Sequence, residues 1–223
     1  MNLAYNGHKG KSLSEVIGDV PAISMKGISK ELPWPGSRCG WIEVYNADRD
    51  PMFANYIKSI INAKMVEVCS TTLPQKAIPR VFEHPAYADH LMKRRKRYER
   101  FSKIGYEKLS GIPGVMVNQT NGAFYMTVVF EDGMINQKQK LVITNPEVRK
   151  LIESLTAEDE KMQLDKRFVY YLLGATGICV VPLTSFSSEL QGFRVTLLET
   201  EKKRFTETFD TLSDNINQYL ASG

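Results

Sequence analysis

A lysine and an arginine stand eight residues apart near the start of the chain, in a stretch made mostly of turn-forming and apolar residues. The stretch covers residues 27–41 and contains Lys30 and Arg38. A lysine can form an imine only through its neutral amine, whereas an arginine keeps its charge and offers a planar fork of donors that suits a phosphate. Pro35-Gly36 predicts a tight turn that can fold Arg38 back toward Lys30. The alternative is a surface loop with an ordinary lysine and arginine.

A second candidate, Arg194, lies near the carboxyl end of the chain. It is flanked by Phe193 and Val195 in an apolar segment that predicts a strand. An arginine buried there would cost free energy unless it has a partner. Three interpretations are open: it binds a carboxylate ligand, it forms an internal ion pair, or it faces solvent at a strand edge.

Together these segments resemble the pyridoxal-phosphate aminotransferases of classes I and II, the fold-type-I family. Residues 27–41 are similar to the family's cofactor-lysine segment, in the branch with a Gly-hydrophobic-Ser-Lys motif that includes the alanine-type transaminases. Residues 177–195 are similar to its C-terminal signature. The resemblance implies that Lys30 forms the Schiff base with pyridoxal 5'-phosphate and that Arg38 pairs with the cofactor phosphate. It also implies that Arg194 grips the substrate α-carboxylate.

Two positions depart from the family pattern. Gly27 stands where other branches often have a hydroxyl residue that contacts the phosphate, and Ser29 could partly replace that contact. The family often continues its C-terminal strand with Pro-Gly-Ser-x-Phe-Gly, whereas residues 182–187 are Pro-Leu-Thr-Ser-Phe-Ser. The loss of both glycines alters the loop expected to shape the substrate pocket.

The resemblance covers nearly the whole chain but only the C-terminal half of a complete aminotransferase. The family's phosphate-binding loop, the aromatic ring that stacks on the cofactor, and the asparagine and aspartate that contact the pyridine ring are expected upstream. Without a carboxylate on the pyridine nitrogen the cofactor is a poorer electron sink. We therefore expect this chain alone not to transaminate, and the full-length parent to be a homodimeric aminotransferase acting on an amino acid and a 2-oxo acid.

The fold class is predicted to be α/β. Residues 1–48 are expected to be the last piece of the large cofactor domain, and residues 49–223 a small domain with its leading helices and a mainly antiparallel sheet covered by helices. Strands are predicted at 22–26, 39–45, 115–117, 123–130, 178–182 and 192–198, and helices at 52–82 with a break at 69–75, 87–109, 146–155, 165–174 and 199–221.

The break at 69–75 resembles a small-polar-Pro-Gln segment that lies near the active site of the partner subunit in the family. On that resemblance Thr71 or Thr72 approaches the neighbouring protomer's cofactor. The residues alone favour a simpler role, a helix N-cap by Thr72 ahead of Pro74.

A basic run at 93–97 reads Lys-Arg-Arg-Lys-Arg within the predicted 87–109 helix. Such runs can bind nucleic acid or an anionic membrane. However, Asp89, Glu99 and Glu107 share the helix, and no aromatic or Gly-rich nucleic-acid motif accompanies the run. We therefore expect a solvent-exposed helix face and no nucleic-acid partner.

Composition is typical of a soluble globular protein, with 43% hydrophobic and 24% charged residues and a net charge of +4 over 223 residues. No apolar run reaches the roughly 18 residues of a membrane span, and the amino terminus lacks a signal-peptide pattern. The cysteines Cys39, Cys69 and Cys179 have no CxxC spacing, and there are three histidines. These features predict reduced thiols, a cytoplasmic location and no metal site.

Two classes of alternative remain beside the transaminase. The first is a pyridoxal-phosphate-dependent lyase or acyl-transferring synthase of the same fold; a lyase would release pyruvate without a keto-acid acceptor. The second is a non-catalytic binding module that keeps the fold, which failure of the parent to bind cofactor would favour.

Overall fold

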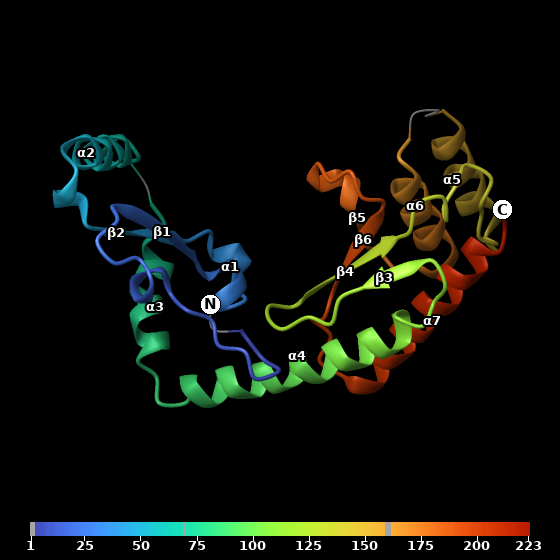
Figure 1. Ribbon diagram of the computed structural model, residues 1–223, viewed down its shortest axis with the longest axis horizontal. Coiled ribbons are helices and arrows are strands. Elements are labelled where there is room, and N and C mark those ends of the chain that lie inside the picture. Colours follow the sequence, from blue (N-terminus) through green and yellow to red (C-terminus); the bar gives the residue numbers. More distant parts are fainter. Residues whose placement is uncertain (1–2, 69, 159–161) are drawn as a thin grey trace. The chain divides into compact units, whose positions relative to one another are not determined.

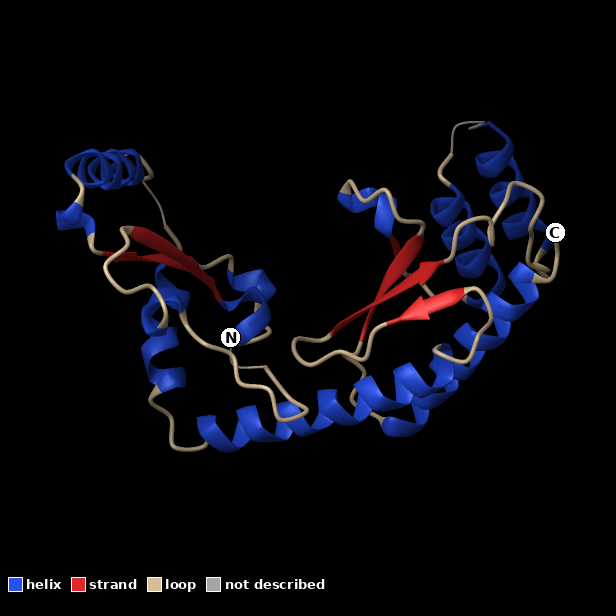
Figure 2. Ribbon diagram, in the orientation of Figure 1, coloured by secondary structure: helices blue, strands red, loops and turns tan. Residues whose placement is uncertain are grey.

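The computed structural model describes residues 3–68, 70–158 and 162–223, so Cys69 lies outside the described residues (Figure 1). It consists of helices and antiparallel strands (Figure 2), which confirms the predicted α/β class. Contacts divide the chain into a first unit, Met1–Arg95, and a second unit, Lys96–Gly223. The boundary predicted after residue 48 concerns the two domains of the parent enzyme and stays a prediction.

The first unit is built on a two-stranded sheet. Strand β1 (Ala22–Gly27) pairs antiparallel with β2 (Gly40–Tyr45), from Ala22 opposite Tyr45 to Gly27 opposite Gly40. A Cβ atom at Gly40 would lie 2.7 Å from the carbonyl oxygen of Lys26, so the close approach of the strands here requires glycine. Between the strands lie helix α1 (Ile28–Glu31) and the 3-10 turn η2 (Pro35–Ser37).

Two helices follow the sheet in the first unit, α2 (Pro51–Met65) and α3 (Thr72–Phe82). The Asp50 carboxylate caps α2 by accepting hydrogen bonds from the amides of Met52 (2.8 Å) and Phe53 (3.3 Å), and proline takes the first helical position, as predicted. The N-cap predicted for α3 was wrong by one residue. Thr71 occupies that position, without a side-chain cap bond, because Thr72 already has helical geometry.

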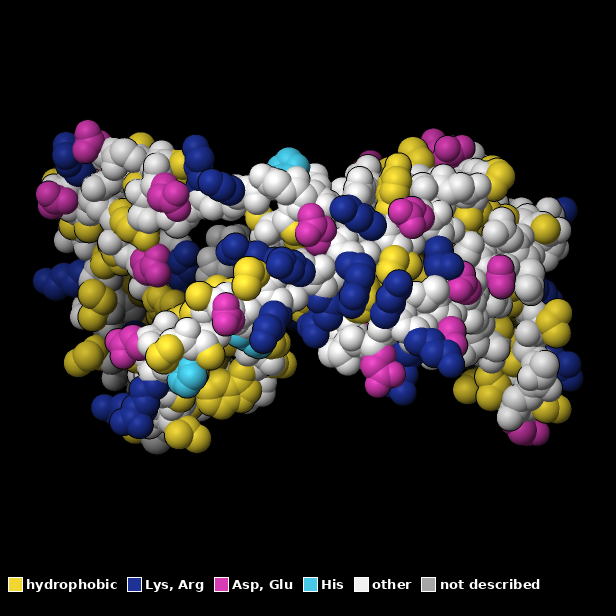
Figure 3. Space-filling model, turned by 90° about the horizontal axis from the view of Figure 1, so that it is seen from below, with side chains coloured by type: hydrophobic (Ala, Val, Ile, Leu, Met, Phe, Trp, Pro, Cys, Tyr) yellow, Lys and Arg dark blue, Asp and Glu magenta, His cyan; other side chains and the backbone are white. Residues whose placement is uncertain are grey.

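Helix α4 (Tyr87–Leu109) begins in the first unit and ends in the second. Its outer surface carries Lys and Arg side chains interspersed with Asp and Glu (Figure 3). Among the described residues no helix has both the length and the apolar character needed to cross a membrane.

The second unit contains a four-stranded antiparallel sheet in the order β3-β4-β6-β5. Helix α6 contacts β5, β6, α5 and α7, so the helices cover the sheet as predicted. The predicted strand 178–182 pairs only at its last two residues, where Val181 lies opposite Arg194. The elements are β3 (Val115–Val117), β4 (Tyr125–Phe130), α5 (Pro146–Glu158), α6 (Leu164–Thr176), β5 (Val181–Pro182), β6 (Gly192–Thr196) and α7 (Lys202–Leu220).

An aromatic cluster fills the core of the second unit. The Phe168 ring lies 5.1 Å from the rings of both Phe130 and Tyr219 and 5.5 Å from that of Phe193, and each of these side chains is at most 2% exposed. Aromatic pairs at these distances contribute beyond their buried area. The strand that carries Arg194 is therefore fixed by its packing.

Candidate functional site

Lys30 and Arg38 both lie on the connection between β1 and β2. Ile28, fully buried, anchors this connection: its amide donates to the Cys39 carbonyl (3.3 Å), and its own carbonyl accepts from the amides of Leu32 (3.1 Å) and Trp34 (3.3 Å). Helix α1, which carries Lys30, contacts the η2 turn that leads directly to Arg38. The segments that bear the two candidate residues are therefore adjacent.

Arg38 has a left-handed backbone, with φ 49° and ψ 45°. This conformation costs about 1 kcal/mol or more for a residue other than glycine. It is held by the η2 turn: the Arg38 amide and Nη1 both donate to the Pro35 carbonyl (3.4 and 3.2 Å), and the Ser37 hydroxyl donates to the Trp34 carbonyl (2.7 Å). Strained residues of this kind concentrate at functional sites.

The Arg38 side chain lines an open pocket of about 530 Å³ in the first unit. The pocket is also lined by Lys64, Glu67, Ser70 and Thr71, so a second cation, a carboxylate and two hydroxyls share it with the guanidinium. Lys64 pairs with Glu67 and donates to the Ser70 hydroxyl (3.0 Å). The hydrogen bond from Lys64 lowers the pKa of the Glu67 carboxyl. The set of donors suits an oxyanion such as a phosphate.

Lys30 has an exposed side chain, and the neighbouring Ser29 is half-buried. Neither residue lines the pocket that Arg38 lines. The structure thus joins Lys30 and Arg38 through their backbone segments, while Lys30 lies outside the pocket described above. In the part of the chain that the structure describes, no carboxylate forms an ion pair with Arg38.

Arg94 is a residue that the sequence reasoning missed. It was predicted to face solvent with the rest of the run 93–97, but its side chain is only 4% exposed. Its guanidinium donates to the carbonyl oxygens of Glu31 (2.6 Å, from Nη1) and Lys30 (3.4 Å, from Nη2). The prediction was wrong because Arg94 lies four residues before Tyr98 and seven before Phe101, which are 1% and 0% exposed and mark the buried face of α4.

The remaining members of the run follow the prediction more closely. Lys93, Arg95 and Lys96 are exposed, and Arg97 is half-buried. Helical periodicity applied to the charged residues, and not only to the apolar ones, would have separated Arg94 from its neighbours.

Arg194 lies on β6 in the second unit, is half-buried, and contacts two aromatic rings. Its Cζ is 4.4 Å from the ring centre of Tyr125 and 4.1 Å from that of Phe186. No carboxylate among the described residues forms an ion pair with it, so the internal ion pair considered above is absent there. Both distances are within the range of a cation–π contact, so the two rings restrict the position of the guanidinium.

The loop that brings Phe186 to Arg194 keeps its turn without glycine. Ser187 adopts the left-handed conformation, with φ 58° and ψ 30°, at the position where the family pattern has its second glycine. The fully buried Asp165 carboxylate fixes the start of the loop by accepting from the Thr184 amide (3.0 Å) and hydroxyl (2.7 Å). Hydrogen bonds therefore hold a loop that departs from the family sequence.

Metal ligands do not gather in the described residues: no group of three or more His, Cys, Asp or Glu side chains is placed to bind an ion. Cys39 and Cys179 are free thiols.

Comparison with known proteins gives consistent matches. The model of the family described as aminotransferase class I and II matches residues 2–207. An uncharacterized aminotransferase of Methanocaldococcus jannaschii is 54% identical over 219 residues, which is 98% of this chain and 50% of that protein. Tyrosine aminotransferase of Dictyostelium discoideum is 25% identical over 156 residues, 68% of this chain and 36% of that protein.

Among solved structures, alanine aminotransferase from Pyrococcus furiosus matches with a TM-score of 0.72 and 21% identity, covering 99% of this chain and 47% of that one. LysN, an α-aminoadipate aminotransferase from Thermus thermophilus complexed with N-(5'-phosphopyridoxyl)-L-leucine, matches with a TM-score of 0.66 and 14% identity, covering 99% and 49%. These two likenesses show the fold. The chain spans about half the length of the proteins it matches.

Proposed function

Because the chain belongs to the class I and II aminotransferase family, we propose that it forms the C-terminal portion of a pyridoxal-phosphate-dependent aminotransferase. In this proposal Lys30 binds the cofactor covalently, Arg38 and Ser29 hold its phosphate, and Arg194 binds the substrate carboxylate. The observation that carries the proposal is the strained β1–β2 connection, which brings the segments that bear Lys30 and Arg38 next to each other and places Arg38 in a pocket with a lysine and two hydroxyl groups.

The side chains present fit such a cofactor chemically. Lys30 is an exposed residue whose amine is of the type that reacts with a carbonyl carbon, and a guanidinium beside hydroxyl groups suits a phosphate. Pyridoxal phosphate, when bound, supplies the electron sink that permits proton loss at a substrate Cα.

The remaining chemistry falls to this chain's own residues. Lys30 is the general base and acid that moves the proton at the substrate Cα. Arg194 orients the amino acid by a two-pronged hydrogen bond to its carboxylate, and its contacts with the rings of Tyr125 and Phe186 restrict where the guanidinium lies.

The same proposal extends to the activity of a full-length protein, as long as the relatives that this chain matches. We propose amino-group transfer between an amino acid and a 2-oxo acid by a cytoplasmic homodimer, with this chain alone inactive. A lyase or an acyl-transferring synthase of the same fold would use the same lysine and arginines, and a binding module would use neither in a reaction.

The test of cofactor capture uses the purified chain. It is incubated with pyridoxal phosphate, reduced with borohydride, and digested for mass spectrometry, beside Lys30→Ala and Lys58→Ala, the latter an exposed lysine on α2. We expect a visible absorption band and a reduced adduct at Lys30 in the wild type and in Lys58→Ala but not in Lys30→Ala. Equal labelling of several lysines, with no band lost in Lys30→Ala, would contradict the proposed role of Lys30.

The reaction is tested separately in a polypeptide that joins this chain to the N-terminal half of the Methanocaldococcus relative. We expect transfer of an amino group to a 2-oxo acid, and a large loss of rate in Lys30→Ala and Arg194→Gln. Release of pyruvate without an acceptor would identify a lyase instead, and turnover by the unjoined chain at a comparable rate would refute its predicted inactivity.

A further inference from the structure

Outside the proposed site residues, the strongest feature is a buried arginine, Arg94, that contacts the end of helix α1, which carries Lys30. Arg94 is 4% exposed, and its guanidinium donates to two consecutive carbonyl oxygens at the end of α1, those of Lys30 and Glu31. The two partners lie 64 and 63 residues away along the chain. Helix α4 is thereby tied to the backbone of the proposed cofactor lysine.

A helix as short as α1 needs such a partner. The last carbonyl oxygens of any helix have no N–H donor within the helix, so they accept hydrogen bonds from other groups. In α1 the Ile28 carbonyl receives the amides of Leu32 and Trp34, but the Lys30 and Glu31 carbonyls lie beyond that arrangement. A charged donor with a planar fork suits two neighbouring carbonyls because its N–H groups have a fixed geometry, whereas the ammonium of a lysine is a point charge on a flexible stem.

We propose that Arg94 is a positioning residue for Lys30: it fixes the α1 turn so that the lysine amine is held ready for a carbonyl compound. It does not touch that compound. This inference rests on the proposed function for the role of Lys30, but the hold of Arg94 on the turn can be measured without any cofactor.

The first measurement is hydrogen exchange of the purified chain without ligand, for wild type, Arg94→Met, Arg94→Lys and Lys93→Met. Lys93 is the exposed neighbour with the same charge and serves as the matched control. In Arg94→Met we expect the Leu32 and Trp34 amides to lose about tenfold or more of their protection, because hydrogen bonds to charged groups typically have that strength. The amides that pair β1 with β2 should keep theirs, and Arg94→Lys should be intermediate.

The second measurement is the rate of capture of pyridoxal phosphate at Lys30, followed by borohydride reduction over a range of concentrations. In Arg94→Met we expect a lower rate at saturation with an unchanged half-saturating concentration, since Arg38, which is proposed to hold the phosphate, is untouched. Arg94→Lys should recover part of the rate, and Lys93→Met all of it. A general loss of structure would instead raise the half-saturating concentration and lower protection throughout the first unit.

Wild-type protection at Leu32 and Trp34 together with a wild-type capture rate in Arg94→Met would overturn the proposal. So would a loss spread evenly over β1, β2 and the turn. If Arg94→Met does not fold, Arg94→Lys is the test. Wild-type protection and a wild-type capture rate in Arg94→Lys would then overturn the proposal. If neither the wild-type chain nor any variant captures the cofactor, the proposed capture at Lys30 by this chain alone fails, while hydrogen exchange still tests whether Arg94 holds the α1 turn.

Discussion

The two units of the chain place their candidate arginines by different means. In the second unit Arg194 sits on a sheet whose core is packed with buried aromatic rings, and further rings hold its side chain. The first unit has a much smaller core. Among its described residues the buried hydrophobic side chains are Leu3, Tyr5, Ile28, Ile57 and Ile78.

The first unit compensates with local backbone geometry. Its sheet has two strands, fewer than a sheet usually needs for independent stability, and it leaves large apolar side chains such as Met25, Met65 and Val68 at least 80% exposed. The left-handed turn at Arg38 and the hydrogen bonds from Arg94 position the connection instead. A site can thus be positioned by a packed core or by a few hydrogen bonds, and the second kind is the easier to disturb.

The largest expected difference concerns the cores. Phe168→Ala should lower the free energy of unfolding of the second unit by about 3–5 kcal/mol, because a fully buried ring leaves a cavity among other rings. Met25→Ala, at an 84% exposed position of the first unit, should change stability by less than about 0.5 kcal/mol. Urea denaturation followed by near-ultraviolet circular dichroism measures both. Similar losses would show that the cores do not differ as described.

A second difference should appear in alkali. Burial raises the pKa of the Tyr219 hydroxyl from 10.0 to about 12, so the folded state favours its neutral form. The resulting stability is fully present below pH 10 and is lost as the pH rises toward 12, by roughly 2 kcal/mol. Tyr219→Phe should flatten this loss in denaturation curves between pH 9 and 12, whereas Tyr56→Phe, at an exposed position of the first unit, should not. An unchanged slope in Tyr219→Phe would contradict the burial argument.

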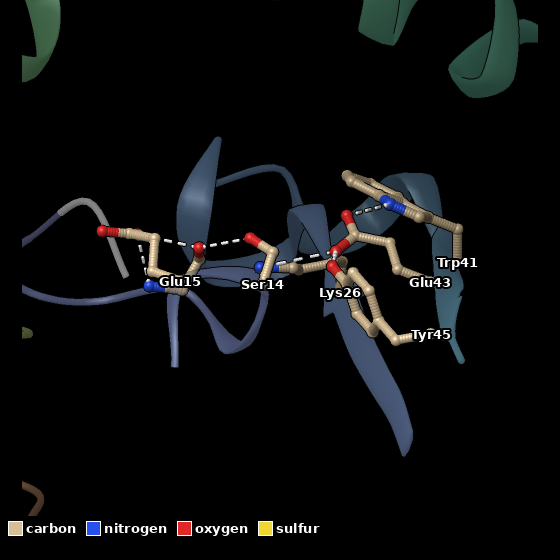
Figure 4. A network of polar contacts seen from close by, with 7 residues as sticks. Ser14, Glu15, Lys26, Trp41, Glu43 and Tyr45 are labelled. Atoms are coloured by element: carbon tan, nitrogen blue, oxygen red, sulfur yellow. Dashed lines mark hydrogen bonds and ion pairs between the residues drawn. The ribbon is translucent and has the colours of Figure 1, made fainter. Parts of the chain in front are cut away.

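The smallest effect should appear in acid and in the first unit. On one face of β1 and β2 the Glu43 carboxylate accepts hydrogen bonds from the Tyr45 hydroxyl (2.7 Å) and the Trp41 indole (3.1 Å), with Lys26 at 4.0 Å (Figure 4). These hydrogen bonds, of which the one from Tyr45 has the larger effect, lower the pKa of Glu43 below 4.5. The stability that they give the folded state is therefore present above that pH and is lost as the pH falls through the lowered pKa.

The indole N–H resonance of Trp41 reports on this network. In the wild type it should move as the pH falls below about 4.5, the ordinary value for a glutamate. In Glu43→Gln the resonance should stay constant over the same range. A matching shift in both proteins would show that the indole does not depend on the carboxylate.

Local patterns predicted most of the elements. The helices from α2 onward and strands β1 and β2 lie close to their expected positions, because apolar spacing, Asp50 and Pro51 act within a few residues of where they stand. Contacts between distant segments were not accessible in this way. The donation of Arg94 to α1 and of the Thr184 and Gly192 amides to Asp165 joins residues that no local pattern connects.

The long helix α4 has a consequence for any attempt to divide the gene. The boundary between the two units falls at Arg95 and Lys96, inside 23 continuous helical residues, so a split there would interrupt the helix. The connection at 83–86, between α3 and α4, is the better place. A C-terminal product made in this way would keep Arg94, and the N-terminal product would keep the two carbonyl groups that Arg94 binds, so that each fragment retains one half of a contact through which the two could complement each other in trans.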